Sequence, residues 1–324
     1  MKEIKIASLF CGCGGTDVGF RGGFEFLGKH YAVHKTKLVY ANDIESSACE
    51  IFRKNFGINP DQKDIKLVKS EEIPSCNVVL GGFPCQSFSV VAQNPPRLGI
   101  KSPLGQLFFE MCRIVKEKQP EVFMAENVKG ILSSNKGETF PLILKEFGSC
   151  GYSVNWKLLK AVDFGIPQKR ERVIIIGVRN DLHKTFNFDE LPVRKPDEYA
   201  ILRNVVQESV PENYFFSDKA VAGMVRVRGV MNKGRAQDLD KPCNTVGAHL
   251  AKVSLNSTDP VLFDGGRFRR FTPREVARIQ SFPDSYELFG SEHAQYKALG
   301  NAVAPLMAWY LSEEIYSQIL KDKK

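Results

Sequence analysis

The chain has 324 residues, 43% of them hydrophobic and 25% charged, a balance that excludes a disordered chain and is typical of a globular protein. No apolar stretch reaches the roughly 18 residues that a membrane-spanning helix needs, and the first residues run into an expected strand rather than a signal peptide, so we expect a cytoplasmic protein. Its 45 basic and 37 acidic residues give a net charge of +8, which favours a polyanionic partner without requiring one.

Short apolar runs alternate with segments of helical periodicity along the first half of the chain. Several of these runs are too continuously apolar for a sheet with one exposed face, so we interpret them as interior strands, at residues 4–10, 38–41, 77–80, 121–125 and 172–178. Between them, apolar residues share one helical face around residues 48–55 and again at 107–115. This alternation predicts a doubly wound α/β fold.

The alternation ends after about residue 179. Residues 191–196 (LPVRKP) interrupt the chain, and the segment up to about residue 265 has no regular rhythm of strands and helices. A helical apolar pattern returns at residues 302–320, and we expect this last helix to pack back on the first domain. We therefore predict one domain from residues 1–185 with 290–324, and a smaller, irregular domain from residues 186–289.

Glycines and acidic residues follow the first strands. Residues 10–15 (FCGCGG) predict a turn that lets a ligand approach the backbone, although they do not match the GxGxxG pattern. Asp43 follows the second strand, where α/β sites hold ribose hydroxyls, and Asp64 with Ile65 offers a polar group beside an apolar surface suited to adenine. Helix capping is the alternative role for both aspartates. Together these features favour an adenosine-containing cofactor.

A thiol and a carboxylate follow two further interior strands. Cys85 lies after two glycines and a proline, and Glu126 lies about forty residues later, in the same kind of position. Because ligands of open α/β sheets bind outside the carboxyl ends of the strands, we expect both side chains to face one pocket. The cysteines form no paired CxxC sets with histidines at zinc-binding spacing, so we expect reduced thiols and no metal site. A nucleophile and an acid together indicate an enzyme.

Six sequence blocks occur in a fixed order: FCGCGG at 10–15, GFPCQS at 82–87, ENV at 126–128, QKRERV at 168–173, RFTPREVARIQSFP at 270–283 and GNAV at 300–303. In this order the chain resembles the DNA cytosine-5 methyltransferases over nearly its whole length, and most closely the bacterial restriction-modification type. The resemblance implies a Rossmann-like, S-adenosylmethionine-dependent methyltransferase domain. It also implies that residues 186–289 form a target-recognition domain.

The resemblance implies roles for individual residues. Cys85 would add to C6 of cytosine, Glu126 would protonate or hydrogen-bond N3, and Arg172 would orient the ring carbonyl and a neighbouring phosphate. Arg170 and Asn127 complete the expected catalytic set. S-adenosyl-L-methionine, which leaves as S-adenosyl-L-homocysteine, is expected to contact Phe10, Gly12, Cys13, Gly14, Asp43, Ile44, Asp64, Ile65, Gly82, Pro84, Leu107, Asn301 and Ala302. Ile44 stands where some relatives carry an aromatic residue, so we expect weaker stacking on adenine.

The target carbon of a cytosine is hidden inside a stacked duplex, so the resemblance implies that the base is extruded into the pocket. We expect residues 87–106 to form a loop that closes over the DNA, with a rigid connector as the alternative. Double-stranded DNA is the expected partner of a monomer that works alongside a restriction endonuclease without a stable complex. We expect DNA contacts from Gln86, Ser89, Gln168, Arg226, Arg228, Arg235 and Thr245.

Three other functions stay open at this point. An NAD-dependent oxidoreductase would explain the glycine-rich turn and Asp43, but it leaves Cys85, Glu126 and the QKRERV block without a role. An RNA cytosine-5 methyltransferase acting on transfer RNA would use the same catalytic domain, although the long variable region between residues 181 and 268 favours DNA. A nucleic-acid-binding protein without activity would not need an intact nucleophile and acid.

Overall fold

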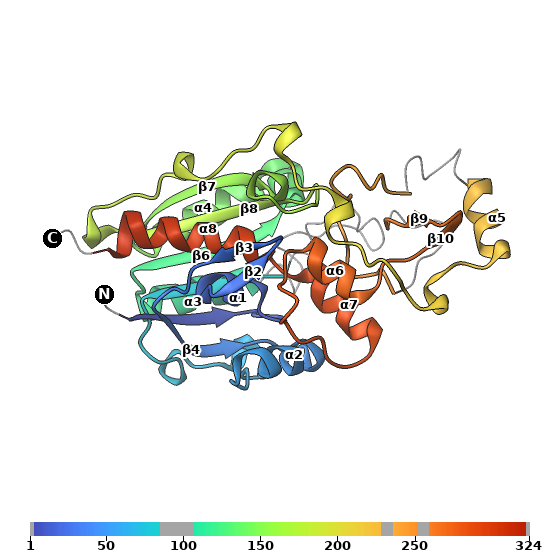
Figure 1. The fold of residues 1–324 in the computed structure, drawn as a ribbon. Coiled ribbons are helices and arrows are strands. Elements are labelled where there is room, and N and C mark those ends of the chain that lie inside the picture. The colour runs from blue at the N-terminus through green and yellow to red at the C-terminus, as the bar shows by residue number, and fades with distance from the viewer. Residues whose placement is uncertain (1–2, 85–106, 228–235, 252–258, 322–324) are drawn as a thin grey trace.

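The described residues form a central six-stranded sheet with helices on both faces (Figure 1). The structure, a computed structural model, describes residues 3–84, 107–227, 236–251 and 259–321. In spatial order the strands are β4 (Thr36–Asn42), β1 (Ile4–Leu9), β5 (Val78–Gly81), β6 (Val122–Val128), β8 (Glu171–Arg179) and β7 (Tyr152–Lys160). The first four are parallel, whereas β8 runs antiparallel to both of its neighbours. The predicted α/β fold is confirmed.

The remaining described elements are helices and two short hairpins. The α-helices are α1 (Gly15–Arg21), α2 (Ser46–Phe56), α3 (Leu107–Lys118), α4 (Thr139–Ser149), α5 (Asp218–Val227), α6 (Pro273–Ile279), α7 (Glu292–Asn301) and α8 (Pro305–Ile315). The hairpins pair β2 (Phe24–Phe26) with β3 (Lys29–Tyr31), and β9 (Leu262–Asp264) with β10 (Arg267–Arg269). Of the helices in the described ranges, none has the length and apolar character needed to cross a membrane.

Successive residues of the central strands are buried on opposite faces of the sheet. Val78 and Leu80 of β5 belong to one apolar cluster, which also contains Leu311 of α8. Val79 lies between them in sequence and belongs to a second cluster, with Phe147 of α4. Because side chains alternate along a strand, a strand covered on both faces must be apolar at nearly every position. This explains the continuous apolar runs in the sequence.

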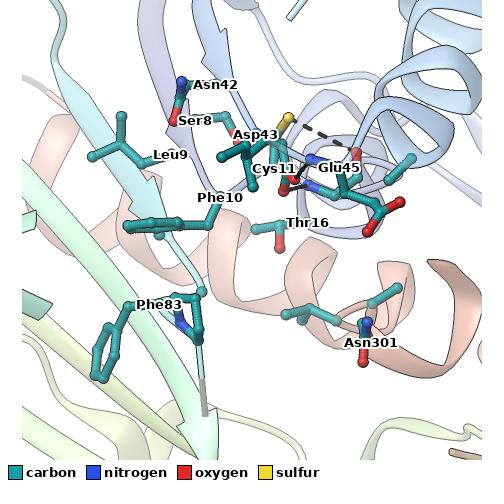
Figure 2. A pocket seen from close by; sticks show the side chains of 18 of the residues that line it. Ser8, Leu9, Phe10, Cys11, Thr16, Asn42, Asp43, Glu45, Phe83 and Asn301 are labelled. Carbon is teal, nitrogen blue, oxygen red and sulfur yellow. Dashed lines mark hydrogen bonds between the residues drawn. The ribbon is translucent and has the colours of Figure 1, made fainter. Parts of the chain in front are cut away.

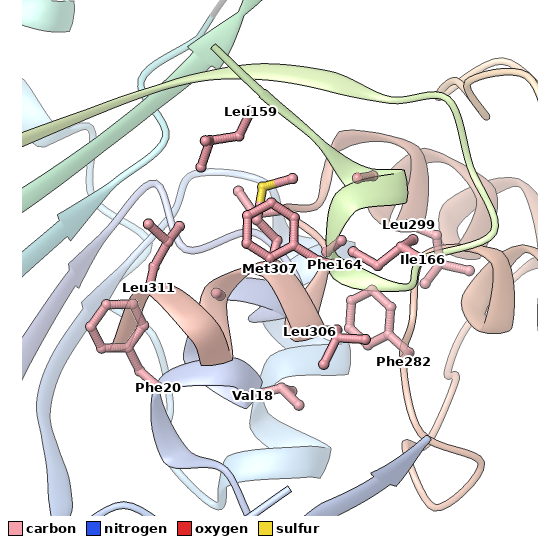
Figure 3. Packing of buried hydrophobic residues seen from close by; sticks show 14 of the residues in the cluster. Val18, Phe20, Leu159, Phe164, Ile166, Phe282, Leu299, Leu306, Met307 and Leu311 are labelled. Carbon is pink, nitrogen blue, oxygen red and sulfur yellow. The ribbon is translucent and has the colours of Figure 1, made fainter. Parts of the chain in front are cut away.

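Helix α8 packs along α1 and returns the end of the chain to the sheet, as predicted (Figure 3). Val18 and Phe20 of α1 share their buried cluster with Leu306 and Leu311 of α8. The two helices approach closely at Gly19, where a methyl group would lie 2.4 Å from the carbonyl oxygen of Pro305. Only glycine allows this distance without a shift of the backbone.

Replacement of Gly19 should therefore destabilise the fold. We expect Gly19→Ala to lower the free energy of unfolding by about 1–3 kcal/mol, because the added methyl group overpacks the contact between α1 and α8. Gly148→Ala in α4 is the matched control, since no atom lies within 4 Å of the added methyl group there. Its higher helix propensity should stabilise the protein by up to about 1 kcal/mol. Urea denaturation measures both, and equal effects would contradict the packing argument.

The sequence pattern did not predict β7 or the reversed direction of β8. Strand β7 lies at the end of the sheet, most of its residues are only partly buried, and Trp156 is 42% exposed. Such a strand lacks the continuous apolar run that identifies an interior strand. Strand β8 is buried on both faces whichever way it runs, so its composition carries no information about direction.

Residues 186–289 contribute short elements, of which α5, β9 and β10 lie beyond the end of the sheet (Figure 1). Other parts of this segment belong to the main core. Phe186, Leu202 and Phe271 are buried in the same cluster as residues of the sheet. The core is thus continuous across residue 185, and the division into two domains stays a prediction.

Candidate active site

A cavity of about 460 Å³ lies at the carboxyl ends of the parallel strands β1, β4, β5 and β6. Figure 2 shows residues from both ends of the chain in its wall, including Phe10 and Asn301. Most of the predicted cofactor residues line it: Phe10, Gly12, Asp43, Ile44, Asp64, Ile65, Gly82, Pro84, Leu107, Asn301 and Ala302. Glu126 and Arg172 line the same cavity, so the structure brings the predicted cofactor residues and two predicted catalytic residues together.

The glycine-rich turn after β1 has a left-handed backbone at Phe10, Gly12 and Gly14, with φ angles of 53°, 54° and 83°. The amide of Gly12 donates a hydrogen bond of 2.8 Å to Oδ2 of Asp43. The turn after β1 is therefore tied to the end of β4. Glycine meets this geometry without the strain that a side chain would add at positive φ.

Two residues of this turn, Cys13 and Gly14, belong to the predicted cofactor set but pack toward the core. Gly14 faces α2, and a Cβ atom there would lie 2.5 Å from the ring of Phe56. Cys13 is buried, and its thiol lies 3.6 Å from the carbonyl oxygen of Ala298, to which it donates. Neither residue lines the cavity. They pack on the core side of the turn, because the chain faces the cavity and the core alternately at this point.

Asp43 holds the backbone around it. Its Oδ2 accepts from Gly12, and its Oδ1 accepts a hydrogen bond of 2.8 Å from the amide of Glu45. Burial raises the pKa of the Asp43 carboxyl, while the two backbone hydrogen bonds act in the opposite direction. The next residue, Ile44, is 69% exposed although it is apolar, and it lines the cavity together with Ile65. These two side chains offer an apolar surface to a flat ring.

Glu45 and Lys297 also line the cavity, although neither is predicted from the sequence. Lys297 of α7 donates a hydrogen bond to Glu45, and this contact lowers the pKa of the Glu45 carboxyl. The hydroxyl of Ser47 donates to the same carboxylate, over 3.0 Å. The only sequence signal for Glu45 was its position two residues after Asp43. Lys297 carried none, because α7 is far from the first strands in sequence.

Glu126 of β6 and Arg172 of β8 form an ion pair at the other side of the cavity. Nε of Arg172 lies 2.8 Å from Oε1 of Glu126, and the two side chains are only 13% and 12% exposed. The strands are neighbours, so the pair is held by the sheet itself. An added methyl group on Gly82 would lie 3.3 Å from Oε2 of Glu126, which shows how closely the backbone before Cys85 approaches the carboxylate.

Cys85 itself, together with Gln86, Ser89, Arg228, Arg235 and the loop predicted at residues 87–106, lies outside the described residues. Pro84, the residue before Cys85, is described and lines the cavity. Asn127 is buried beside this segment and donates a hydrogen bond of 3.1 Å to the carbonyl oxygen of Phe83. Asn127 does not line the cavity. It holds the backbone that leads to Cys85, and its place in the catalytic set stays a prediction.

Two predicted functional residues of the QKRERV block are fully buried. Arg170 donates to the carbonyl oxygens of Val246, Gly300 and Ala302, at 3.3, 3.1 and 2.9 Å. Gln168, with no exposed surface, donates a hydrogen bond of 2.8 Å to Gln280 and accepts one of 2.9 Å from the amide of Val246. The catalytic role of Arg170 and the DNA contact of Gln168 stay predictions. Arg170 does not line the cavity, and Gln168 cannot contact DNA without leaving the core.

The described part of the predicted DNA-binding set is small. Thr245 is exposed, and its hydroxyl donates a hydrogen bond of 3.2 Å to the carbonyl oxygen of Lys169. Arg226 belongs to α5, whose backbone is described, but its side chain falls outside the described part of the chain. Thr245 lies next to the QKRERV block, because the backbone of the nearby Cys243 pairs with residues 167–169.

Comparisons with known proteins show which family the chain is related to. Residues 4–317 match the model of the family described as C-5 cytosine-specific DNA methylase. The type II methyltransferase M1.ScrFI of Lactococcus lactis subsp. cremoris is 33% identical over 337 residues, which cover 99% of this chain and 80% of that protein. The type II methyltransferase M.FnuDI of Fusobacterium nucleatum is 34% identical over 347 residues, covering 99% and 96%.

A solved structure supports the fold. The Entamoeba histolytica methyltransferase EhMeth superposes on 99% of this chain and 100% of its own, with a TM-score of 0.77 at 19% identity. The match of the family model over nearly the whole chain, and relatives above 30% identity over nearly the same span, establish the relationship. The chain belongs to the C-5 cytosine-specific DNA methylase family.

Proposed function

We propose that this enzyme transfers a methyl group from S-adenosyl-L-methionine to C5 of a cytosine that is extruded from a specific sequence of double-stranded DNA. The observation that carries the proposal is the single cavity that contains both the surface suited to adenosine and the Glu126–Arg172 pair. Pro84, in the wall of the same cavity, delivers the chain directly to Cys85. The cofactor, the target base and the nucleophile can therefore meet in one place.

The residues of the cavity fit S-adenosylmethionine. Ile44 and Ile65 offer apolar contact to adenine, while Asp43, Glu45 and Asp64 place carboxylates where hydroxyl and amino groups need acceptors. When bound, this cofactor supplies an electrophilic methyl group on a sulfonium centre. Asn301, at the end of α7, also lines the cavity.

The chain's own residues would make the poorly nucleophilic C5 reactive. The Cys85 thiolate adds to C6 and forms a covalent bond, which shifts electron density to C5. Glu126 donates a proton or hydrogen bond to N3 and so stabilises the charge that builds up on the ring. Arg172 holds Glu126 in place and can orient the ring carbonyl. After methylation, loss of the C5 proton expels the Cys85 thiolate and restores the aromatic ring.

We further propose that the protein protects host DNA in a restriction-modification system. The support is that both bacterial relatives described above are named type II methyltransferases. In this proposal the protein acts on DNA as a monomer, alongside a nuclease with the same recognition sequence and without a lasting complex between them. The cost of extruding the base is a few kcal/mol, which contacts to DNA must offset.

Bisulfite sequencing of plasmid DNA from a host that expresses the protein tests this function. We expect 5-methylcytosine at one cytosine of one short sequence, at every copy of that sequence. Transfer RNA from the same host is the matched control, and we expect it to stay unmodified relative to cells without the gene. If transfer RNA were methylated and the plasmid were not, the substrate would be RNA rather than DNA.

A further inference from the structure

Lys129 and Glu171 form an exposed ion pair beside the cavity. Nζ of Lys129 lies 2.9 Å from Oε2 of Glu171, and the two side chains are 58% and 32% exposed. Lys129 directly follows β6 and begins the 3₁₀ helix η4 (Lys129–Gly137), while Glu171 begins β8. Their chain neighbours Val128 and Arg172 are paired in the sheet and both line the cavity. The ion pair therefore stands at the rim of the catalytic cavity without belonging to its wall.

Glu171 is surrounded by basic residues in the sheet and in sequence. Lys160 of β7 lies directly opposite Glu171 in the strand register and is exposed, and Lys169 precedes it by two residues and is exposed as well. One carboxylate thus stands among three lysines. An exposed ion pair contributes only about 0–1 kcal/mol, so Lys129 can exchange Glu171 for another anion at little cost.

The extruded nucleotide places such an anion at this rim. When a base rotates out of the duplex about its backbone, its flanking phosphates stay outside the pocket, close to the pocket's opening. Lysine binds a phosphate as a point charge, without the fixed geometry of arginine. We propose that Lys129 binds a DNA backbone phosphate at the rim of the cavity, and that Glu171 holds Lys129 in the free enzyme and releases it to DNA.

This inference rests on the proposed DNA substrate and predicts opposite effects for the two partners of the pair. Lys129→Met should weaken binding of a fluorescently labelled duplex by about five- to tenfold at 0.1 M salt, because one contact with its counterion release is lost. The slope of log affinity against log salt concentration should fall by about 0.9. Glu171→Gln should tighten binding by roughly two- to threefold, because the phosphate no longer competes with a carboxylate.

The double variant shows whether Lys129 exchanges Glu171 for a phosphate or whether the ion pair is only structural. In the Lys129→Met background, Glu171→Gln should change the affinity very little, because the lysine that it frees is gone. Lys157→Met is the matched control: Nζ of Lys157 pairs with Asp189 over 2.8 Å, with 40% of the lysine side chain exposed, in β7 away from the cavity. It should change neither the affinity nor the salt slope. Fluorescence anisotropy at several salt concentrations measures all four variants.

Two outcomes would overturn the inference while leaving the proposed function intact. One is that the wild-type protein binds and methylates DNA, but Lys129→Met leaves the slope of log affinity against log salt concentration unchanged. The other is weaker binding by Glu171→Gln as well as by Lys129→Met, which is the result expected if the pair only braces β6 against β8. A wild-type protein that neither binds nor methylates the duplex would instead contradict the proposed function itself.

Discussion

Cys85→Ser should abolish methyl transfer, with a loss of about 10⁴-fold or more in turnover, because a serine hydroxyl is a far weaker nucleophile than a thiolate toward C6. The direct measurement is covalent trapping. DNA that carries 5-fluorocytosine at the target position cannot lose a C5 proton, so the wild-type enzyme should remain bonded to it after methylation. The adduct survives denaturing electrophoresis, and the serine variant should show none.

Cys76→Ser is the control for this experiment. Cys76 is a free thiol that is 8% exposed and lies outside the wall of the cavity. Its variant should trap the same amount of DNA as the wild type. An undiminished adduct from the Cys85 variant would show that another residue is the nucleophile. Loss of the adduct from both variants would point to a damaged fold, which circular dichroism of each variant would reveal.

Glu126→Gln should have the second largest effect, a fall in turnover of about 10²–10⁴-fold. Glutamine keeps the size and shape of the side chain, but it cannot deliver a proton to N3 and does not pair electrostatically with Arg172. Cofactor affinity should stay within about twofold, because in the proposed mechanism Glu126 serves the base rather than the adenosine surface. Single-turnover methylation measures the chemical step, and titration calorimetry measures binding of S-adenosylmethionine, with NAD as the control ligand.

A second substitution tests the role of the ion pair. Arg172→Lys keeps the positive charge but loses the planar group whose Nε lies 2.8 Å from Glu126. We expect turnover between that of the wild type and that of Glu126→Gln.

Near-normal turnover of Glu126→Gln would show that Glu126 does not act as the acid. If the protein bound NAD but not S-adenosylmethionine, the proposed methyl transfer would be wrong, and an oxidoreductase would be the better proposal.

Local sequence was sufficient to place most of the cavity. The interior strands are recognisable because both of their faces are buried, and the parallel strands end at one edge. Asp43 directly follows β4 and Glu126 lies near the end of β6, so the convergence of these two residues needs only the order of the strands. Strand β7 escaped prediction because it is an edge strand with partly exposed residues. No local pattern marks such a strand as part of a sheet.

The surroundings of Gln168, Arg170 and Arg172 differ for reasons that appear only in the folded chain. Their spacing of two suggests three side chains on one face of a strand, all reaching the same ligand. Strand β8 begins only at Glu171, so Arg172 alone projects into the cavity with the support of the sheet. Arg170 instead meets carbonyl oxygens of residues 246, 300 and 302, which lie 76 to 132 positions further along the chain.

The amino-acid sequence alone was enough to identify the family blocks, the α/β fold and most of the residues that face the cavity from the strand ends. It did not determine which arginine serves the cavity and which one joins the last segment of the chain to the core. A buried guanidinium needs several acceptors, and those acceptors are backbone carbonyls, which every residue carries and which leave no trace in the sequence. Their convergence on Arg170 exists only once Val246, Gly300 and Ala302 are folded around it.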